Sequence, residues 1–487
     1  MVPTPSTAGF HILQGLPTPR GVVRRLSSGC VDHPLSPDYN GLRKGPPMSE
    51  SQISLSQLRR RIARLGPQVT FFLLALLFCG AQGGAFHTTF NNFLADTYDI
   101  SAQTRGLLEF PRELPGLLVT LMAGLLAFLP ETRVGGVALL CSVAGLWGLA
   151  GVGYIDNRAI GWPLMILFMF AWSVGGHLIM PVSESIGMSL GTVAHRGRKL
   201  GQVRAAGAVG GVAGAGMVWV LTELVSVPSW RTSVTTGLPT PPYWLVFGIG
   251  GLFALVATIL LLRIREIGSQ TKRPRLIIRR QYWLYYVLSL LFGARKQAFL
   301  TFAPWVLIRI FNQPPSTFAK LWIVAAGSSL FIIPTVGKLI DRFGERRLLM
   351  ANSVLILLIC MVYGFAYRWG ITGPGLWLTL ACYILDELLF SVEMARSTYL
   401  SKIVENPDDL PASLSLGVSL DHAVGMSVPA LGGWMWDRGG TYGHRWVFAG
   451  AACVAVLMGI FASMIRVPDS RTPSGAPADE DTAQAGS

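Results

Sequence analysis

Two adjacent basic residues in the middle of an apolar stretch are the first residues of this sequence that could do chemistry. Arg295 and Lys296 lie near the centre of the stretch 281–308, and Gln297 follows them. A charged side chain at the centre of a membrane-spanning helix costs about 2.5–3.5 kcal/mol if it faces lipid. The two cations must therefore face a cavity or counter-charges. Because paired cationic donors can neutralise an anion in a dry site, we expect them to bind an anionic or carboxylate-bearing solute.

Other apolar stretches also carry polar side chains at their centres. Gln82 and His177 could orient a bound solute, although a lone histidine such as His177 is more often a hydrogen-bonded packing residue. A carboxylate at this depth could take up and release a proton and so couple proton movement to solute binding. The candidates for proton coupling are Asp386, Glu393, Glu184 and Glu387.

The spacing of these acidic residues predicts how they are arranged. Asp386 and Glu393 are seven positions apart, which places them on one face of a continuous helix. Glu393 and Arg396 are three positions apart and could instead form an internal ion pair. The sequence leaves both interpretations of Glu393 open.

Long apolar stretches must position all these residues. Of the 487 residues, 51% are hydrophobic and only 14% are charged, whereas soluble domains carry about 25% charged residues. About 20 apolar residues span a bilayer as a helix. The chain is therefore expected to be an all-α integral membrane protein with 12 transmembrane helices. The expected spans are 68–93, 104–129, 134–154, 160–190, 200–222, 243–263, 281–308, 318–340, 348–367, 373–400, 412–435 and 444–465.

Polar segments flank and divide these spans. We expect disordered tails over 1–67 and 467–487 and a basic linker over 264–280, and Met48 could be an alternative start. The formal net charge of +14 is attributed to basic loops that face the cytoplasm and not to nucleic acid binding. This asymmetry places both termini in the cytoplasm. The six cysteines lie far apart and form no CxxC pair, which disfavours a metal site.

An internal repeat divides the spans into two halves. The segment Gly80–Phe86 of the first span matches Gly293–Phe299 of the seventh, 213 positions later, and the same offset carries Gly124 onto Gly337. A repeat at corresponding spans predicts two pseudo-symmetric six-helix bundles, over 68–263 and 281–466. Such halves usually enclose a site near the middle of the membrane.

A short motif at the end of the eighth span has a known parallel. The sequence from Gly337 to Arg347 reads GKLIDRFGERR. It resembles the loop signature of the major facilitator superfamily of secondary transporters, and the resemblance extends over residues 68–466. It implies that the motif governs the switch between inward-open and outward-open states. The residues implied in this conformational gating are Gly337, Asp341, Arg342, Gly344, Arg346 and Arg347. The first-half copy departs from the signature, with Phe128 in place of the aspartate.

The resemblance also implies that the first, fourth, seventh and tenth spans line the central cavity. We therefore expect a monomeric secondary transporter in a plasma membrane, in bacteria the inner membrane, that moves a small solute with protons. The expected partners are that solute, the lipid bilayer and protons. No ATP-binding phosphate loop or HExxH motif occurs, so no enzymatic activity, cofactor or metal is expected.

Two other functions remain open. A multidrug efflux transporter for lipophilic cations would also use buried acids and aromatic residues, although Arg295 and Lys296 speak against it. A membrane sensor or a lipid-active membrane enzyme belongs to another class. The enzyme has only the weak support of the adjacent Asp421 and His422, for which a lock between two helices is the favoured interpretation.

Overall fold

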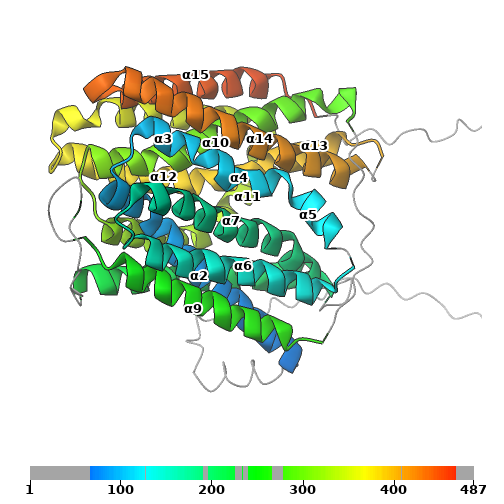
Figure 1. Ribbon diagram of the computed structural model, residues 1–487. Coiled ribbons are helices and arrows are strands. Elements are labelled where there is room, and N and C mark those ends of the chain that lie inside the picture. The colour runs from blue at the N-terminus through cyan, green and yellow to red at the C-terminus, as the bar shows by residue number, and fades with distance from the viewer. Residues whose placement is uncertain are drawn as a thin grey trace, which may run out of the picture. The chain divides into compact units, whose positions relative to one another are not determined.

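The computed structural model describes residues 66–467, apart from residue 127 and residues 190–195, 225–232, 234–239, 266–277 and 407–408. The expected tails and the expected linker 264–280 fall almost entirely outside the described residues, as does Met48. Within the described ranges the ordered elements are helices, with no strand (Figure 1). Nine of these described helices are long and apolar enough to cross a membrane.

The helices from α2 to α9 form the part of the chain that we call the N-terminal half. They are α2 (Pro67–Tyr98), α3 (Ala102–Leu107), α4 (Glu109–Leu117), α5 (Val119–Leu125), α6 (Glu131–Val152), α7 (Arg158–Ser189), α8 (Arg196–Trp219), the π-helical turn η2 (Val220–Leu224) and α9 (Tyr243–Leu262).

The helices from α10 to α15 form the C-terminal half. The elements are the 3-10 turn η3 (Arg280–Tyr282), α10 (Trp283–Arg309), α11 (Pro315–Phe365), η4 (Ala366–Trp369), α12 (Pro374–Leu389), η5 (Phe390–Val392), α13 (Glu393–Ile403), α14 (Asp409–Arg438), η6 (Gly440–Tyr442) and α15 (His444–Ser463).

Several helix boundaries differ from the expected spans. The helix α11 runs through the two spans expected over 318–340 and 348–367, with one break at Gly344, where φ is 78° and ψ is 161°. The span expected over 104–129 is divided among α3, α4 and α5. The all-helical membrane architecture is confirmed, whereas the number of twelve spans stays a prediction.

The internal repeat corresponds to a repeated packing arrangement. In the N-terminal half α2 packs against α8 and α9, and in the C-terminal half α10 packs against α14 and α15. Gly80 of α2 lies against the backbone of Gly207 in α8, and Gly293 of α10 lies against Asp421 in α14. The matching glycines therefore serve the same purpose in both halves, because small residues let two membrane helices approach closely.

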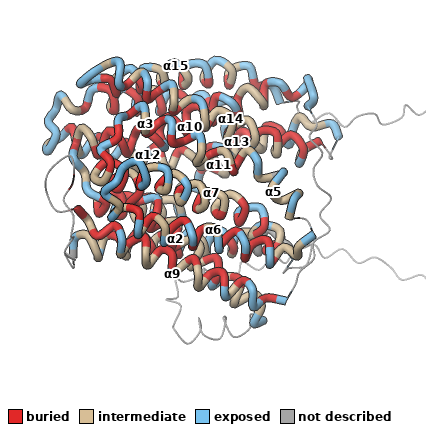
Figure 2. Tube along the Cα trace, in the orientation of Figure 1, coloured by how far each residue is buried: buried red, intermediate tan, exposed pale blue. Residues whose placement is uncertain are grey.

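Buried residues run along the inner faces of the helices (Figure 2). Large apolar side chains are nevertheless exposed on outer faces, among them Leu330 (74% exposed), Phe331 (76%) and Trp377 (69%). Such side chains are unfavourable in water but suit a hydrocarbon environment, so the packing agrees with a membrane-spanning bundle.

The two halves contact each other where α2 ends and α3 begins. The helix α14 packs against α3 and α4, and Arg309 of α10 forms an ion pair with Asp99 at 2.8 Å. The backbone N–H of Gln103 donates to Asp437 at 3.1 Å. We call this end of the bundle, marked by Asp99, Arg309 and Asp437, the closed end.

Candidate functional site

A central cavity of about 710 Å³ lies between the two halves. The helices α2, α7 and α8 of the N-terminal half and α11 and α12 of the C-terminal half line it. It extends from Trp322 and Glu387 to Glu184 and Arg204, a pair near the end of the bundle opposite the closed end. Since both halves contribute walls, a movement of one half against the other would change access to this cavity.

A smaller cavity of about 90 Å³ lies on the other side of four shared residues. These residues line both cavities, and we call them the shared wall. The shared wall consists of His87, Trp322, Tyr383 and Glu387. Arg105 and Arg112 also line the smaller cavity. The shared wall therefore lies where a solute would pass from the central cavity towards the closed end.

Aromatic rings hold the shared wall in place. The His87 ring stacks on Trp322, with ring centroids 5.7 Å apart and planes 9° apart. It also meets the Trp172 ring edge-on at 5.3 Å. The indole N–H of Trp172 donates to Gln82 Oε1 at 2.8 Å, so the expected solute-orienting Gln82 is a buried support for these rings.

Glu387 is the carboxylate of the shared wall. Among the described residues it forms no hydrogen bond or ion pair, although it follows Asp386 directly in α12. The Glu387 side chain is partly exposed, and its exposed part faces the cavities. Glu387 is therefore free to bind a cationic group or a proton.

The two central cations are held by counter-charges. Arg295 forms an ion pair with Asp386 and is only 1% exposed, and its guanidinium lies 4.6 Å from the centroid of the Phe390 ring. Lys296 forms an ion pair with Asp421. Neither cation lines the 710 Å³ or the 90 Å³ cavity. The sequence predicts that Arg295 and Lys296 face either a cavity or counter-charges, and in the structure they face counter-charges.

The remaining predicted solute contacts lie elsewhere in the core. Gln297 is 1% exposed, and its side-chain oxygen has no hydrogen-bond partner among the described residues. It packs against Gly425 of α14. The side chain of His177 contacts Ser173 in its own helix and lies near His422, with ring centroids 5.1 Å apart. The structure therefore does not bring the five predicted solute-binding residues together around one cavity.

Asp386 and Glu393, which were expected on one helix face, lie on either side of the 3-10 turn η5, which separates α12 from α13. Their surroundings differ. Asp386 is buried, whereas the Glu393 side chain is 47% exposed and pairs with Arg396 at 2.6 Å. The alternative of an internal ion pair describes Glu393 correctly. The fourth acid, Glu184, lines the central cavity and pairs with Arg204 at 3.3 Å.

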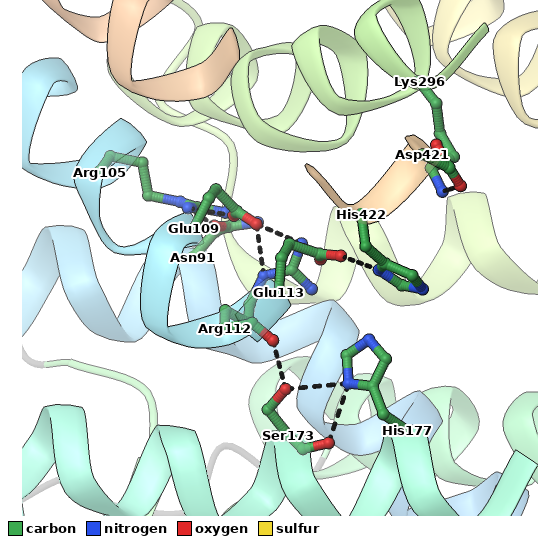
Figure 3. Close-up of polar contacts among 10 residues, drawn as sticks. All are labelled: Asn91, Arg105, Glu109, Arg112, Glu113, Ser173, His177, Lys296, Asp421 and His422. Carbon is green, nitrogen blue, oxygen red and sulfur yellow. Dashed lines mark hydrogen bonds and ion pairs between the residues drawn. The ribbon is translucent and has the colours of Figure 1, made fainter. Parts of the chain in front are cut away.

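A charged network links α3 and α4 to α14 (Figure 3). Two of its members, Arg105 and Arg112, line the smaller cavity. Glu109 accepts from Arg105 at 2.5 Å and also pairs with Arg112, which in turn pairs with Glu113 at 2.8 Å. Glu113 also contacts His422 Nδ1 at 2.9 Å, across the two halves. The sequence does not predict this network as a site. The spacing of three and four positions between its members was the available signal.

The motif at the end of the eighth span forms a sharp turn. Gly344 adopts a positive φ, and the buried Glu345 beside it pairs with Lys402 of α13 at 2.6 Å. The other members of the predicted gating set lie around this turn, and Asp341, Arg342, Arg346 and Arg347 are exposed. Gly337 has open space around its Cα. The role of these residues in conformational gating stays a prediction.

Comparisons with known proteins agree with this arrangement. Residues 285–486 match the family model described as Major Facilitator Superfamily. No curated protein matches the chain in sequence.

Solved structures share the fold over most of the chain. A mutant form of the nucleoside transporter NupG has a TM-score of 0.66 at 14% identity, covering 82% of this chain and 100% of its own. A D-xylose–proton symporter has a TM-score of 0.65 at 15% identity, covering 83% and 98%. A bacterial homologue of the human lysosomal transporter Spinster, inward-facing and occupied, has a TM-score of 0.60 at 18% identity, covering 82% and 96%.

These neighbours are transporters or homologues of transporters, and the chain is a multi-pass membrane protein with their fold. The chain therefore has the fold of these transporters, and its residues 285–486 match the Major Facilitator Superfamily model.

Proposed function

We propose that the chain is a secondary transporter that carries a small solute through the central cavity by alternating access. The observation that carries this proposal is the 710 Å³ cavity, whose walls come from both halves. Rocking of one half against the other would expose the shared wall first to one side of the membrane and then to the other. The fold shared with a nucleoside transporter and a D-xylose–proton symporter supports this function.

The arrangement of the halves corresponds to an inward-facing state in this proposal. The halves meet at the closed end through pairs such as Arg309 and Asp99, and the central cavity extends the other way, to Glu184 and Arg204. The distribution of basic residues assigns that open end, where α2 and α8 begin, to the cytoplasm. A plasma membrane location with both termini inside is part of the same proposal.

The side chains of the central cavity favour a cationic amphipathic solute over an anionic one. Glu387 is the acid of the shared wall without an ion pair, whereas Arg295 and Lys296 already have carboxylate partners. The ring faces of Trp322 and Tyr383 can stack on an apolar or aromatic solute and attract its positive charge. We therefore favour the second function considered for the sequence, export or exchange of lipophilic cations, over carboxylate transport.

Glu387 is also the proposed proton-coupling residue. A cationic solute and a proton would compete for the same carboxylate, so that release of one accompanies binding of the other. Among the other candidates, Asp386 is neutralised by Arg295, and Glu393 lies outside both cavities. Glu184 at the cavity mouth is the second choice, since its pair with Arg204 is exposed.

Flux measurements with the purified full chain in proteoliposomes test this proposal. With a proton gradient applied, we expect uptake of the organic cations ethidium or tetraphenylphosphonium and none of benzoate or lactate. The substitution Glu387→Gln should abolish proton-driven flux, whereas the matched control Glu393→Gln should leave it unchanged. Movement of the carboxylates alone, or cation flux that persists in Glu387→Gln, would contradict the proposed solute and the proposed role of Glu387.

A further inference from the structure

We infer that Glu113, His177 and His422 form a binding site for a divalent first-row transition metal ion such as Zn²⁺. The three side chains come from α4, α7 and α14. Each offers one ligand atom, and these three atoms lie within 4.8 Å of one another. Two imidazoles and one carboxylate are a donor set that Zn²⁺ uses in proteins, with water in the fourth position.

His177 is oriented as a metal ligand would be. Its Nδ1 lies 2.9 Å from the backbone carbonyl oxygen of Ser173, which can only accept, so Nδ1 carries the proton of the neutral ring. The other nitrogen, Nε2, then keeps its lone pair and is turned towards Glu113 and His422 (Figure 3). A hydrogen bond from the second ring nitrogen to a carbonyl is the usual support of a ligating histidine.

Glu113 and His422 complete the donor set. His422 Nδ1 and Glu113 Oε2 are 2.9 Å apart and share one proton in a hydrogen bond. A metal ion would displace this proton and accept both atoms as ligands. Because Zn–N and Zn–O bonds of about 2.0–2.2 Å place ligands roughly 3.3 Å apart, side-chain shifts of about 1 Å would close the site.

The surroundings of the site are charge-balanced and largely buried. Arg112 holds the other carboxylate oxygen of Glu113 at 2.8 Å and also pairs with Glu109, which accepts from Arg105. On the α14 side, Asp421 is neutralised by Lys296. Glu113 itself is only 4% exposed. A bound divalent ion would therefore contact a carboxylate that is poorly hydrated. Arg112 already holds the second oxygen of this carboxylate in place.

The site joins the two halves of the chain. Its ligands on α4 and α7 belong to the N-terminal half, and His422 belongs to the C-terminal half. A metal ion bound by all three would stabilise the arrangement with the closed end shut, since it binds only where the halves meet. The inference concerns metal binding and stability. The metal site can therefore be disproved while the proposed transport function holds, and the transport function can be disproved while the metal site holds.

Zinc binding to the full chain, purified through an affinity tag that contains no histidine, tests the inference. Isothermal titration with ZnCl₂ should show one site that weakens by at least about tenfold in Glu113→Gln, His177→Ala and His422→Ala. The matched control is His87→Ala, which removes a cavity histidine outside the cluster and should leave this site unchanged. Gel filtration of each variant checks that it is folded.

A second measurement does not depend on the titration. Excess Zn²⁺ should raise the thermal unfolding temperature of the unsubstituted chain and of His87→Ala, and should lose this effect in His177→Ala and His422→Ala. Equal zinc affinity in the unsubstituted chain, His177→Ala and His422→Ala would overturn the inference. So would a zinc-dependent stabilisation that survives both substitutions.

Discussion

The ion pair between Arg295 and Asp386 joins α10 to α12 in the core of the C-terminal half, with only 1% of Arg295 exposed. Phe390 and Phe299 lie 4.6 and 5.2 Å from the guanidinium and shield it from water. A charge in such surroundings is tolerated only with its partner, so this pair constrains how the two helices can move relative to each other.

Breaking this pair on one side should destabilise the protein strongly. Arg295→Leu leaves a buried, unpaired carboxylate, which is expected to cost about 3–5 kcal/mol of unfolding free energy. The double variant Arg295→Leu/Asp386→Leu removes both charges and should regain most of that loss. Thermal and denaturant unfolding of the purified variants measure both effects.

The control for this cycle is Glu393→Gln, which removes the exposed partner of Arg396. Because Glu393 is 47% exposed and a glutamine oxygen can still accept a hydrogen bond from the buried Arg396, we expect a smaller loss than that of Arg295→Leu. A double variant no more stable than Arg295→Leu alone would show that the charge pair does not determine the stability of this contact.

The membrane architecture could be predicted because it rests on local patterns. The apolar stretches and the repeated glycines Gly80 and Gly293 are visible in the chain itself, and both correspond to packed helices. The site could not be predicted to the same extent. The partner of Arg295 lies 91 positions away and that of Lys296 lies 125 positions away, and spacing along one helix gives no sign of them.

Exposure was a second property that spacing along a helix does not give. Asp386 and Glu393 are seven positions apart, yet Asp386 is buried in its pair with Arg295, whereas the Glu393 side chain is 47% exposed. The aromatic residues Trp322 and Tyr383 were missed because tryptophan and tyrosine are common in any membrane helix. Their place on the wall of the central cavity distinguishes these two from the others.

The turn at Gly344 should not tolerate a side chain. Its φ of 78° with ψ of 161° lies in a region that is open to glycine almost alone. Gly344→Ala is therefore expected to lower the unfolding free energy by about 1–3 kcal/mol. Thermal unfolding of the purified variant measures the loss.

Gly337 in the same motif supplies the control for this substitution. It is helical, and a Cβ atom added at this position would meet no other atom within 4 Å, so Gly337→Ala should be neutral or slightly stabilising. If both alanine variants are equally stable, the strained turn is not the reason for the glycine at 344.

Cys79 offers a direct probe of access to the central cavity. It lines the 710 Å³ cavity, whereas Cys360 is 3% exposed. In a variant that keeps Cys79 and replaces the other five cysteines by serine, a membrane-impermeant maleimide should label inside-out vesicles faster than right-side-out vesicles. A variant that keeps only Cys360 should stay unlabelled from both sides.

Equal labelling of Cys79 from both sides would contradict the inward-facing arrangement. Faster labelling from the outside would reverse the proposed orientation of the chain. The serine replacements are checked first for unchanged thermal unfolding, because Cys360 and Cys382 are buried in the C-terminal half.

Gly106 holds the closed end together by its lack of a side chain. A Cβ atom at this position would overlap the backbone carbonyl of Pro429 in α14, so α3 and α14 could no longer approach as closely. Gly106→Ala should therefore disfavour the closed arrangement of this end by about 1–3 kcal/mol. Such a change shifts the balance between two states by about 5–150-fold, and labelling of the single-cysteine Cys79 variant from the outside should rise accordingly. Gly216→Ala is the control, since a Cβ there meets no atom within 4 Å. If Gly106→Ala leaves the labelling ratio as Gly216→Ala does, the contact of α3 with α14 is not what keeps the outer end of the cavity shut.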